Sequence, residues 1–386
     1  MYAEEVPAYA TLVEVSRAVN EDVAAALGPD AERLGSLDRV TEERHGAVRV
    51  GSVAELRQAA QVFAGLGMVP VGFYDLREAR GAIPVISTGF RATAPDELAR
   101  SPFRMFCSLL EPADRRFFDA DLAQQVEAFV ARRRLFPTEL LLLAERSERE
   151  GGLDGGEAER FLELATGALA LSQEPVDRAW YERLERVSSV AADIAGVGST
   201  HLNHLTPRVL DIDELDRRLS ARGVAMIDRI QGPPRLATDV LLRQTSFRAL
   251  AEPRRFREAD GSVVDGALTV RFGEVECRGV ALTPAGMELY DDLRGADAET
   301  WELKLPGTLE GLREAGLAWF TPGGEPIVYE DFLPRSAAGI FRSNLTGSGA
   351  RSDEEQGVHR DRAWLAEQLG RTVHDPQDLY AAAALS

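Results

Sequence analysis

The sequence predicts an α+β fold built from two βαβββ modules with a helical insert between them. Two segments share the spacing His-x-x-x-Arg, His45 to Arg49 and His204 to Arg208, and each is followed within a few residues by a helical pattern. After each helix the apolar residues change to the alternation typical of strands. Between the two sets the chain carries long stretches with helical periodicity. The same order of elements therefore occurs twice.

The first module follows an N-terminal helix expected over Leu12–Leu27, where apolar residues recur at helical spacing. The histidine and arginine of the first segment lie on a short strand, His45–Val50, and the next helix covers Val53–Leu66, ending at glycines. Three strands are then predicted, at Met68–Tyr74, Ile83–Thr88 and Phe103–Leu110.

The insert is helical from Ala120 to Ala170, interrupted by the glycine-rich linker Gly151–Gly156, and a further helix is predicted over Val176–Ala195. The pattern of the first module then returns. It comprises a strand at His201–Thr206, a helix at Ile212–Arg222, and strands at Val224–Ile230, Asp239–Leu250 and Leu268–Leu282, the last after a turn at Asp260-Gly261. The duplication depends on element order, because the two modules share no identity-level repeat.

We accordingly divide the chain into four segments: 1–119 with the N-terminal helix and first module, 120–199 with the helical insert, 200–290 with the second module, and the C-terminal segment 291–386.

Composition limits the functional classes. The 386-residue chain is 45% hydrophobic with a formal net charge of −19, which argues against a nucleic-acid or membrane-surface binder but leaves room for an anionic small substrate held by local arginines. The two cysteines form no disulfide framework, and the N-terminus lacks a basic region followed by an apolar stretch. We therefore expect a cytoplasmic protein, with the oligomeric state left open.

The histidine pair at 201 and 204 offers one candidate ligand. Side chains alternate between the faces of a regular strand, so His201 and His204 cannot both point at one small site. The repeated spacing to an arginine favours His204, and His201 is then an outward-facing or supporting residue. Residues four apart share a face, so His45 lies on the same side as Arg49.

A late strand carries two carboxylates. Glu274, Glu276 and Arg278 alternate onto one face of a largely apolar strand, where they are costly unless something pairs with them. An exposed polar face on an edge strand is the simpler explanation. Together with two histidines, however, one carboxylate would complete the facial triad that leaves three positions open on non-haem Fe(II). Either Glu274 or Glu276 could provide it.

Seven segments in order resemble the 2-oxoadipate dioxygenase/decarboxylase family, also called hydroxyglutarate synthase. The resemblance extends from His45 to Leu345. The segments that carry it are His45–Arg49, Leu66–Asp75, Phe103–Leu110, His201–Arg208, Leu242–Leu250, Phe272–Pro284 and Tyr329–Phe341.

The resemblance implies a curled vicinal-oxygen-chelate-like β core around a metal. The second module, 200–290, would carry the metal site, and 291–386 would complete the substrate pocket. It also implies a ferrous ion, Fe(2+), held by His45, His204 and a glutamate. For the glutamate we prefer Glu274 to Glu276, because related oxygenases place this ligand four residues before an arginine on the last strand. Arg49 falls on the arginine that grips the substrate and counts with the three ligands as catalytic.

Two further residues bear on the substrate. The resemblance places Ser336 and the local backbone near it, and at Arg335 the family would be expected to have a small apolar residue. A cation at that position could add a contact to a carboxylate or fill the pocket. The type of reaction is therefore better defined than the identity of the substrate.

The implied reaction is the oxidative decarboxylation and hydroxylation of a 2-oxo acid by O2. For 2-oxoadipate the products are 2-hydroxyglutarate and CO2, a step in lysine catabolism. Two alternatives stay open: a vicinal-oxygen-chelate enzyme with another divalent metal or a different 2-oxo acid, motivated by Arg335, and a non-catalytic binding protein that retains the fold. The complete set of three ligands and Arg49 speaks against the last.

Overall fold

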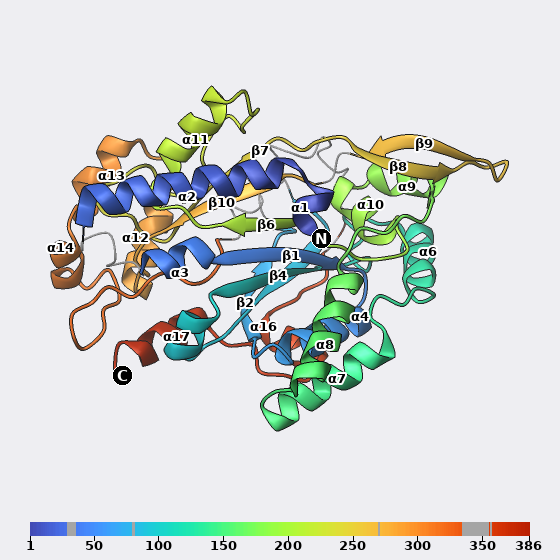
Figure 1. Cartoon of the computed structure of the whole chain (residues 1–386), viewed down its shortest axis with the longest axis horizontal. Helices are drawn as coiled ribbons and strands as arrows, with labels where there is room; N and C mark the ends of the chain where they lie inside the picture. The colour runs from blue at the N-terminus through green and yellow to red at the C-terminus, as the bar shows by residue number, and fades with distance from the viewer. Residues whose placement is uncertain (29–35, 79–81, 269–270, 334–354, 356) are drawn as a thin grey trace.

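The structure is a computed structural model that describes residues 1–28, 36–78, 82–268, 271–333, 355 and 357–386. Its central feature is a mixed five-stranded sheet that receives strands from both halves of the chain (Figure 1). No helix among the described residues is long and apolar enough to cross a bilayer.

The first predicted module is present as βαβββ. Its elements are β1 (Arg44–Val50), α4 (Val53–Ala64), β2 (Val69–Asp75), β3 (Val85–Arg91), the short α5 (Pro95–Arg100) and β4 (Phe103–Leu110). Ser52 caps α4 by accepting a hydrogen bond from the backbone N–H of Glu55. β1 runs parallel to β4, while β2, β3 and β4 are antiparallel neighbours.

The second module adds one strand to this sheet and forms a second, smaller sheet. Its elements are β6 (His204–Pro207), α11 (Ile212–Ala221), β7 (Leu242–Phe247) and β10 (Gly273–Arg278). β6 pairs antiparallel with β1, so the strand order is β2-β3-β4-β1-β6, and β7 pairs antiparallel with β10. The α+β class and the curled sheets agree with the sequence prediction, and the sheets do not close into a barrel.

The second module departs from the prediction in its middle strands. The strand expected at 224–230 is reduced to isolated bridges, Met226 with Phe247 and Gln231 with Gln244. The segment leads into Gly232-Pro233-Pro234, and proline supplies no backbone donor for a continued ladder. The strand expected at 239–250 begins only at 242, because Leu241 adopts a positive φ of 56°.

The strand expected at 268–282 is likewise shorter, and the turn at Asp260-Gly261 belongs to a hairpin that was not predicted. This hairpin consists of β8 (Glu252–Arg257) and β9 (Val263–Leu268), with the two-residue β5 (Val176–Asp177) beside β8. It projects from the body at the upper right of Figure 1. Gly261 has φ +83°, a conformation that glycine adopts without strain.

The insert is helical as predicted, with two breaks more than expected, at residues 131–137 and 186–188. Its helices are α6 (Ala120–Val130), α7 (Thr138–Glu150), α8 (Gly155–Ala168), α9 (Arg178–Glu185) and α10 (Ser189–Ala195). The single helix expected over 176–195 is divided because Ser188 has extended backbone and caps α10 through the N–H of Val190.

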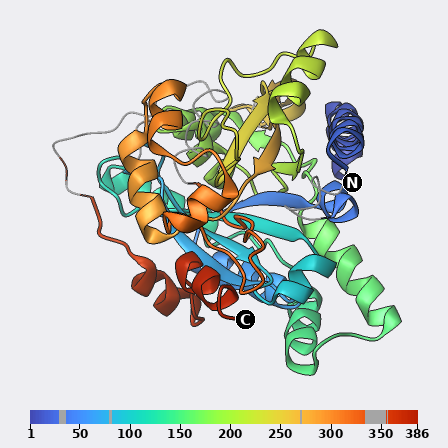
Figure 2. The same ribbon diagram turned by 90° about the vertical axis from the view of Figure 1, so that its left-hand side faces the viewer.

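The remaining helices lie at the two ends of the chain. They are α1 (Tyr2–Glu5), α2 (Ala8–Leu27), α3 (Leu37–Glu42), α12 (Pro284–Leu293), α13 (Ala298–Lys304), α14 (Leu309–Glu314), α16 (Arg362–Leu369) and α17 (Pro376–Ala383). α2 contacts α11 and β10, and its Tyr9 hydroxyl accepts a hydrogen bond from Arg44 of β1. In Figure 2 it is seen end-on at the edge of the molecule.

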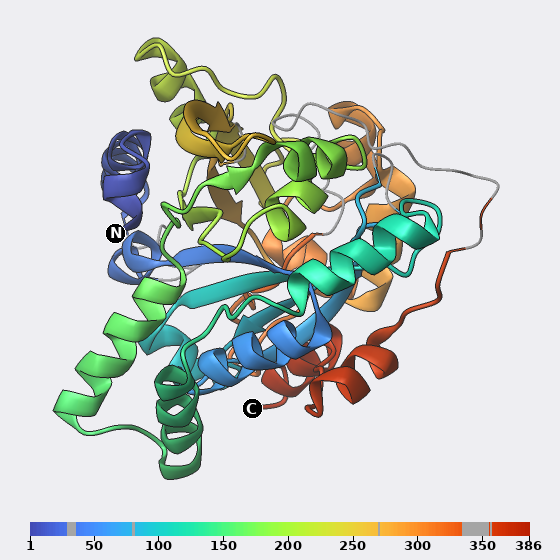
Figure 3. The same ribbon diagram turned by 90° about the vertical axis from the view of Figure 1, so that its right-hand side faces the viewer.

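The five-stranded sheet lies between two layers. Helices α4, α7 and α16 pack together, and Figure 3 shows α4 and α7 below the sheet and the second module above it. Alternation along β1 divides its residues accordingly: Val48 and Val50 belong to the core that contains Leu56 of α4, while Ala47 packs in a second core with Phe106. His45 and Arg49 share the face of Ala47, which looks toward β10.

Candidate metal centre

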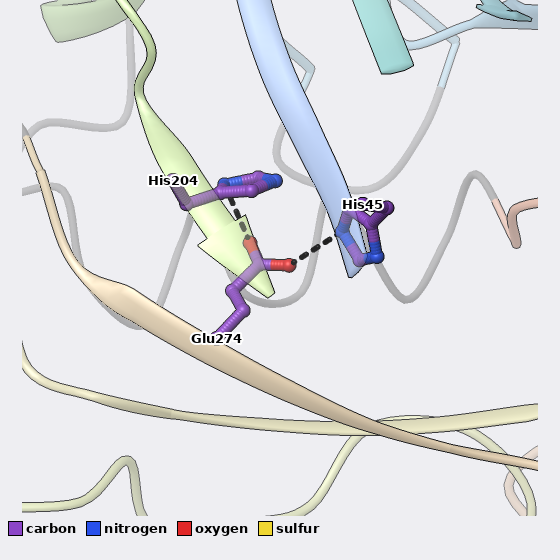
Figure 4. A group of neighbouring side chains, drawn as sticks. All are labelled: His45, His204 and Glu274. Atoms are coloured by element: carbon purple, nitrogen blue, oxygen red, sulfur yellow. Dashed lines mark ion pairs between the residues drawn. The ribbon is translucent and has the colours of Figure 1, made fainter. Parts of the chain in front are cut away.

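Three side chains from three strands meet between the two sheets. They are His45 on β1, His204 on β6 and Glu274 on β10 (Figure 4). The Glu274 carboxylate lies 3.6 Å from Nε2 of His45 and 3.3 Å from Nδ1 of His204. One donor atom from each residue lies within 4.8 Å of the other two, and all three side chains are buried.

Strand register places these residues together. In the antiparallel β1–β6 pair, His204 is opposite Ala47 and Thr206 is opposite His45. His204 and His45 are therefore diagonal neighbours on one face, with ring centroids 5.2 Å apart. Glu274 approaches that face from β10 of the second sheet. Side chains alternate along β10, so Glu274 points toward the histidines while its neighbour Val275 points into the apolar core on the other face.

The donor set fits a divalent cation. Within the described part of the chain, neither ring nitrogen of His204 has a hydrogen-bond partner, and a buried polar atom in that state is costly. Burial lowers the pKa of His204 to about 4, so that its ring is neutral near pH 7 and keeps a lone pair for a metal. Two imidazoles and a carboxylate with open positions are the ligands preferred by non-haem Fe(II).

The two other candidates, His201 and Glu276, lie outside this cluster. His201 is not outward-facing: it is buried, lies outside the cluster, and its Nε2 is 3.1 Å from Nδ2 of Asn203 and 3.4 Å from Asp193. Glu276 is buried on the other side of the His45 ring, 2.7 Å from Nδ1. The strand carrying both glutamates is thus fully buried, and the interpretation as an exposed polar edge does not hold.

Arg49 is buried on the same face as His45, and its guanidinium is held by a carboxylate. Its Nη1 donates to Oδ2 of Asp193 at 2.5 Å, and Nδ2 of Asn203 donates to the same oxygen at 2.9 Å. Burial opposes ionisation of Asp193, but His201 and Arg49 outweigh it and lower the pKa of that carboxyl below its ordinary value. Asp193 therefore stays ionised and fixes one side of Arg49.

An aromatic wall borders the triad. The Phe332 ring meets the His45 ring edge-on at 5.2 Å and lies 4.9 Å from the Phe106 ring, with Tyr74 beside both. These side chains are at least nine-tenths buried. Apolar rings next to polar ligands lower the local dielectric and exclude water.

Other polar residues on β7 and β10 have structural partners. Gln244 donates to Oε2 of Glu274 at 3.4 Å, while Thr245 donates to Asp216 at 2.9 Å on the outer face. Arg278 forms an ion pair with Glu276. Arg335 and Ser336 lie outside the described residues.

Asp193 is a residue of the site that was not predicted from the sequence, although the sequence contains a signal for it. The helix Ser189–Ala195 is buried throughout, and Asp193 is its only charged residue. A lone carboxylate in an apolar helix requires a buried partner, which here is Arg49. The partner is 144 positions away in sequence, so that the pairing itself is visible only in the fold.

Comparisons with known proteins agree on one family. Residues 1–344 match the family model described as 2-oxoadipate dioxygenase/decarboxylase. A protein of that name from Mycobacterium tuberculosis is 57% identical over 389 residues, covering 100% of this chain and 94% of the relative. The crystal structure of hydroxyglutarate synthase from Pseudomonas putida in complex with 2-oxoadipate is similar with a TM-score of 0.84 at 36% identity, covering 100% of this chain and 93% of that one.

A more distant likeness concerns the fold alone. A glyoxalase-superfamily protein from Ralstonia eutropha matches with a TM-score of 0.50 at 22% identity, over 69% of this chain and 83% of that protein. This likeness agrees with the vicinal-oxygen-chelate-like core expected from the sequence.

Proposed function

Because this chain belongs to the 2-oxoadipate dioxygenase/decarboxylase family, we propose that it converts 2-oxoadipate and O2 into 2-hydroxyglutarate and CO2. The observation that carries the proposal is a buried site of two histidines and one carboxylate, with a buried arginine four residues along the same strand from the first histidine. We also propose that the reaction serves lysine catabolism in the cytoplasm.

The reaction balances without a further co-substrate. Carbon 1 of the six-carbon 2-oxo acid leaves as CO2, the former keto carbon becomes a carboxylate, and the adjacent carbon gains a hydroxyl group. Both atoms of O2 enter the products, one in the new carboxylate and one in the hydroxyl group. A bound Fe(2+) would supply the activation of O2 and the positions at which the 2-oxo acid group is held.

His45, His204 and Glu274 are the residues that would hold the ion. Each comes from a different strand, so the donor positions depend on the packing of two sheets and not on a flexible loop. Gln244 donates to the Glu274 carboxylate and restricts its rotation. Such support holds ligands in place before the metal arrives.

Arg49 would bind the remote carboxylate of the substrate. A guanidinium presents paired donors that match a carboxylate in a bidentate manner. The Cα atoms of His45 and Arg49 are ~13 Å apart for a strand rising ~3.3 Å per residue. Two side chains and an extended six-carbon diacid can fit along that distance, so the position of Arg49, set by Asp193, would define the preferred chain length.

Oxygen consumption by the anaerobically Fe(2+)-loaded protein tests the proposal. A series of 2-oxo acids including 2-oxoadipate and 2-oxoglutarate would be supplied, and products identified by mass spectrometry under ¹⁸O2. We expect turnover of 2-oxoadipate to 2-hydroxyglutarate carrying two labelled oxygens, lost in His204→Ala. Turnover of only another acid would favour the alternative substrate, and reconstitution with other divalent metals would identify the ion.

A further inference from the structure

A second carboxylate faces the His45 ring from the side opposite the triad. Glu276 Oε2 lies 2.7 Å from Nδ1 of His45, whereas Glu274 Oε2 lies 3.6 Å from Nε2. The imidazole is therefore between two glutamates of one strand, with one nitrogen toward each. Glu274 and Glu276 are two residues apart on β10 and share its inner face.

This arrangement determines which nitrogen of His45 can bind a metal. Nε2 is on the side of Glu274 and His204, so it is the nitrogen that faces the centre. A neutral imidazole carries its proton on one nitrogen and a lone pair on the other. A carboxylate beside Nδ1 stabilises the form with the proton on Nδ1, which leaves the lone pair on Nε2.

Glu276 is held in place by its own partners. Arg278 donates to both of its oxygens, from Nε at 2.7 Å and from Nη2 at 3.1 Å, and the backbone carbonyl of Glu276 accepts from the N–H of Val209 at 2.8 Å. The Glu276 side chain has no exposed surface.

We propose that Glu276 is a positioning residue for the metal centre, whose carboxylate fixes the Nδ1–H form and the orientation of His45 so that Nε2 points at the metal. Nδ1 and Oε2 lie 2.7 Å apart, within hydrogen-bonding distance, although the oxygen lies off the direction of a straight N–H bond. The inference rests on the metal site of the proposed function and adds a residue that does not touch the metal.

The same buried network offers a matched control. Glu43 is as buried as Glu276 and pairs with Arg104 at 2.8 Å and Arg208 at 3.0 Å, and it also lies 3.5 Å from Arg278. No contact joins the Glu43 side chain to His45 among the described residues. Glu43→Gln therefore removes an equivalent buried charge without changing the neighbour of Nδ1.

The first measurement is the affinity for Co2+, used as a spectroscopic substitute for Fe(2+), by competition with a chelator. Loss of a carboxylate behind a metal-bound histidine weakens metal binding about 10–100-fold. We expect this for Glu276→Gln with a changed Co2+ absorption spectrum, and a change of less than about threefold for Glu43→Gln. Equal affinity in wild type and Glu276→Gln, or equal weakening in both variants, would overturn the proposal.

A second measurement needs no variant and decides the case if Glu276→Gln does not fold. ¹⁵N-histidine NMR of the wild type loaded with diamagnetic Zn2+ identifies the protonated nitrogen of each of the chain's five histidines. We expect a proton on Nδ1 and the metal on Nε2 of His45, and the reverse would refute the proposal. Failure of the wild type to bind any divalent metal would instead refute the proposed function, and this inference with it.

Discussion

Replacing Asp331 by asparagine should destabilise the connection between the C-terminal segment and the five-stranded sheet. Asp331 accepts two hydrogen bonds from Arg91 of β3, from Nε at 2.9 Å and from Nη2 at 3.1 Å, and a third from the Tyr380 hydroxyl of α17. All three residues are buried. The next residue, Phe332, borders the candidate metal centre, so the hydrogen bonds to Asp331 also support the aromatic wall.

The size of the effect follows from burial. Removing one partner of a buried ion pair costs about 3–5 kcal/mol, because the other charge remains desolvated. Asparagine keeps one acceptor oxygen, which places the expected loss near the lower limit, about 3 kcal/mol. An exposed pair contributes far less, so Glu139→Gln, which breaks the surface pair with Arg160, should leave unfolding unchanged within error.

The destabilisation by Asp331→Asn also depends on pH, and the direction of this dependence follows from the pKa of Asp331. Burial opposes ionisation of Asp331, but Arg91 and Tyr380 outweigh it and lower its pKa below the ordinary 3.8. A carboxylate with a lowered folded pKa contributes stability that is complete above the unfolded pKa and is lost as the pH falls through the folded value. The difference between wild type and Asp331→Asn should be constant from pH 7 to about pH 5 and should shrink below pH 4.

Urea denaturation followed by tryptophan fluorescence measures the difference in the free energy of unfolding between the wild type and Asp331→Asn. Three of the four tryptophans lie in residues 291–386 and report on this C-terminal segment: Trp301, Trp319 and Trp364. A loss below about 1 kcal/mol at pH 7 would contradict the estimate for a buried pair. A loss that stays the same at pH 3 and pH 7 would show that the ionised form of Asp331 is not what stabilises the fold.

Three further predictions concern single sites. His204→Ala should abolish stoichiometric binding of Co2+ measured by calorimetry, whereas His201→Ala should retain it; equal loss in both would contradict the assignment of ligands. Arg49→Lys keeps the charge but loses paired donors, so kcat/KM for 2-oxoadipate should fall about 10–100-fold, corresponding to one charge-assisted hydrogen bond, with metal affinity unchanged. A Cβ at Gly279 would lie 2.1 Å from backbone atoms. Gly279→Ala should therefore lower the free energy of unfolding in urea by about 1–3 kcal/mol or more. Gly167 lies at an open position in a helix, so Gly167→Ala should raise the free energy of unfolding by up to about 1 kcal/mol. Similar effects of the two substitutions would contradict the close approach of the backbone at Gly279.

The sequence by itself determined the class of fold and most of its elements. Helical and strand periodicities differ, so α4, the strands of the first module and the helical insert were predictable from local pattern. Strand alternation also put His45 and Arg49 on one face, because that relation needs only a regular strand. The resemblance of seven segments supplied the candidate ligands and the reaction.

The tertiary structure decided what depends on segments far apart in sequence. Glu274 and Glu276 have the same alternation, but Glu274 lies against Nε2 of His45 and Nδ1 of His204, whereas Glu276 lies against Nδ1 of His45 and pairs with Arg278. The partner of Arg49 is Asp193, from a buried helix of the insert. Local periodicity fixes the face on which a side chain lies, but the packing of one sheet against another fixes what that side chain meets. A candidate metal centre assembled from three strands is therefore determined by packing, although each of its candidate ligands can be proposed from sequence.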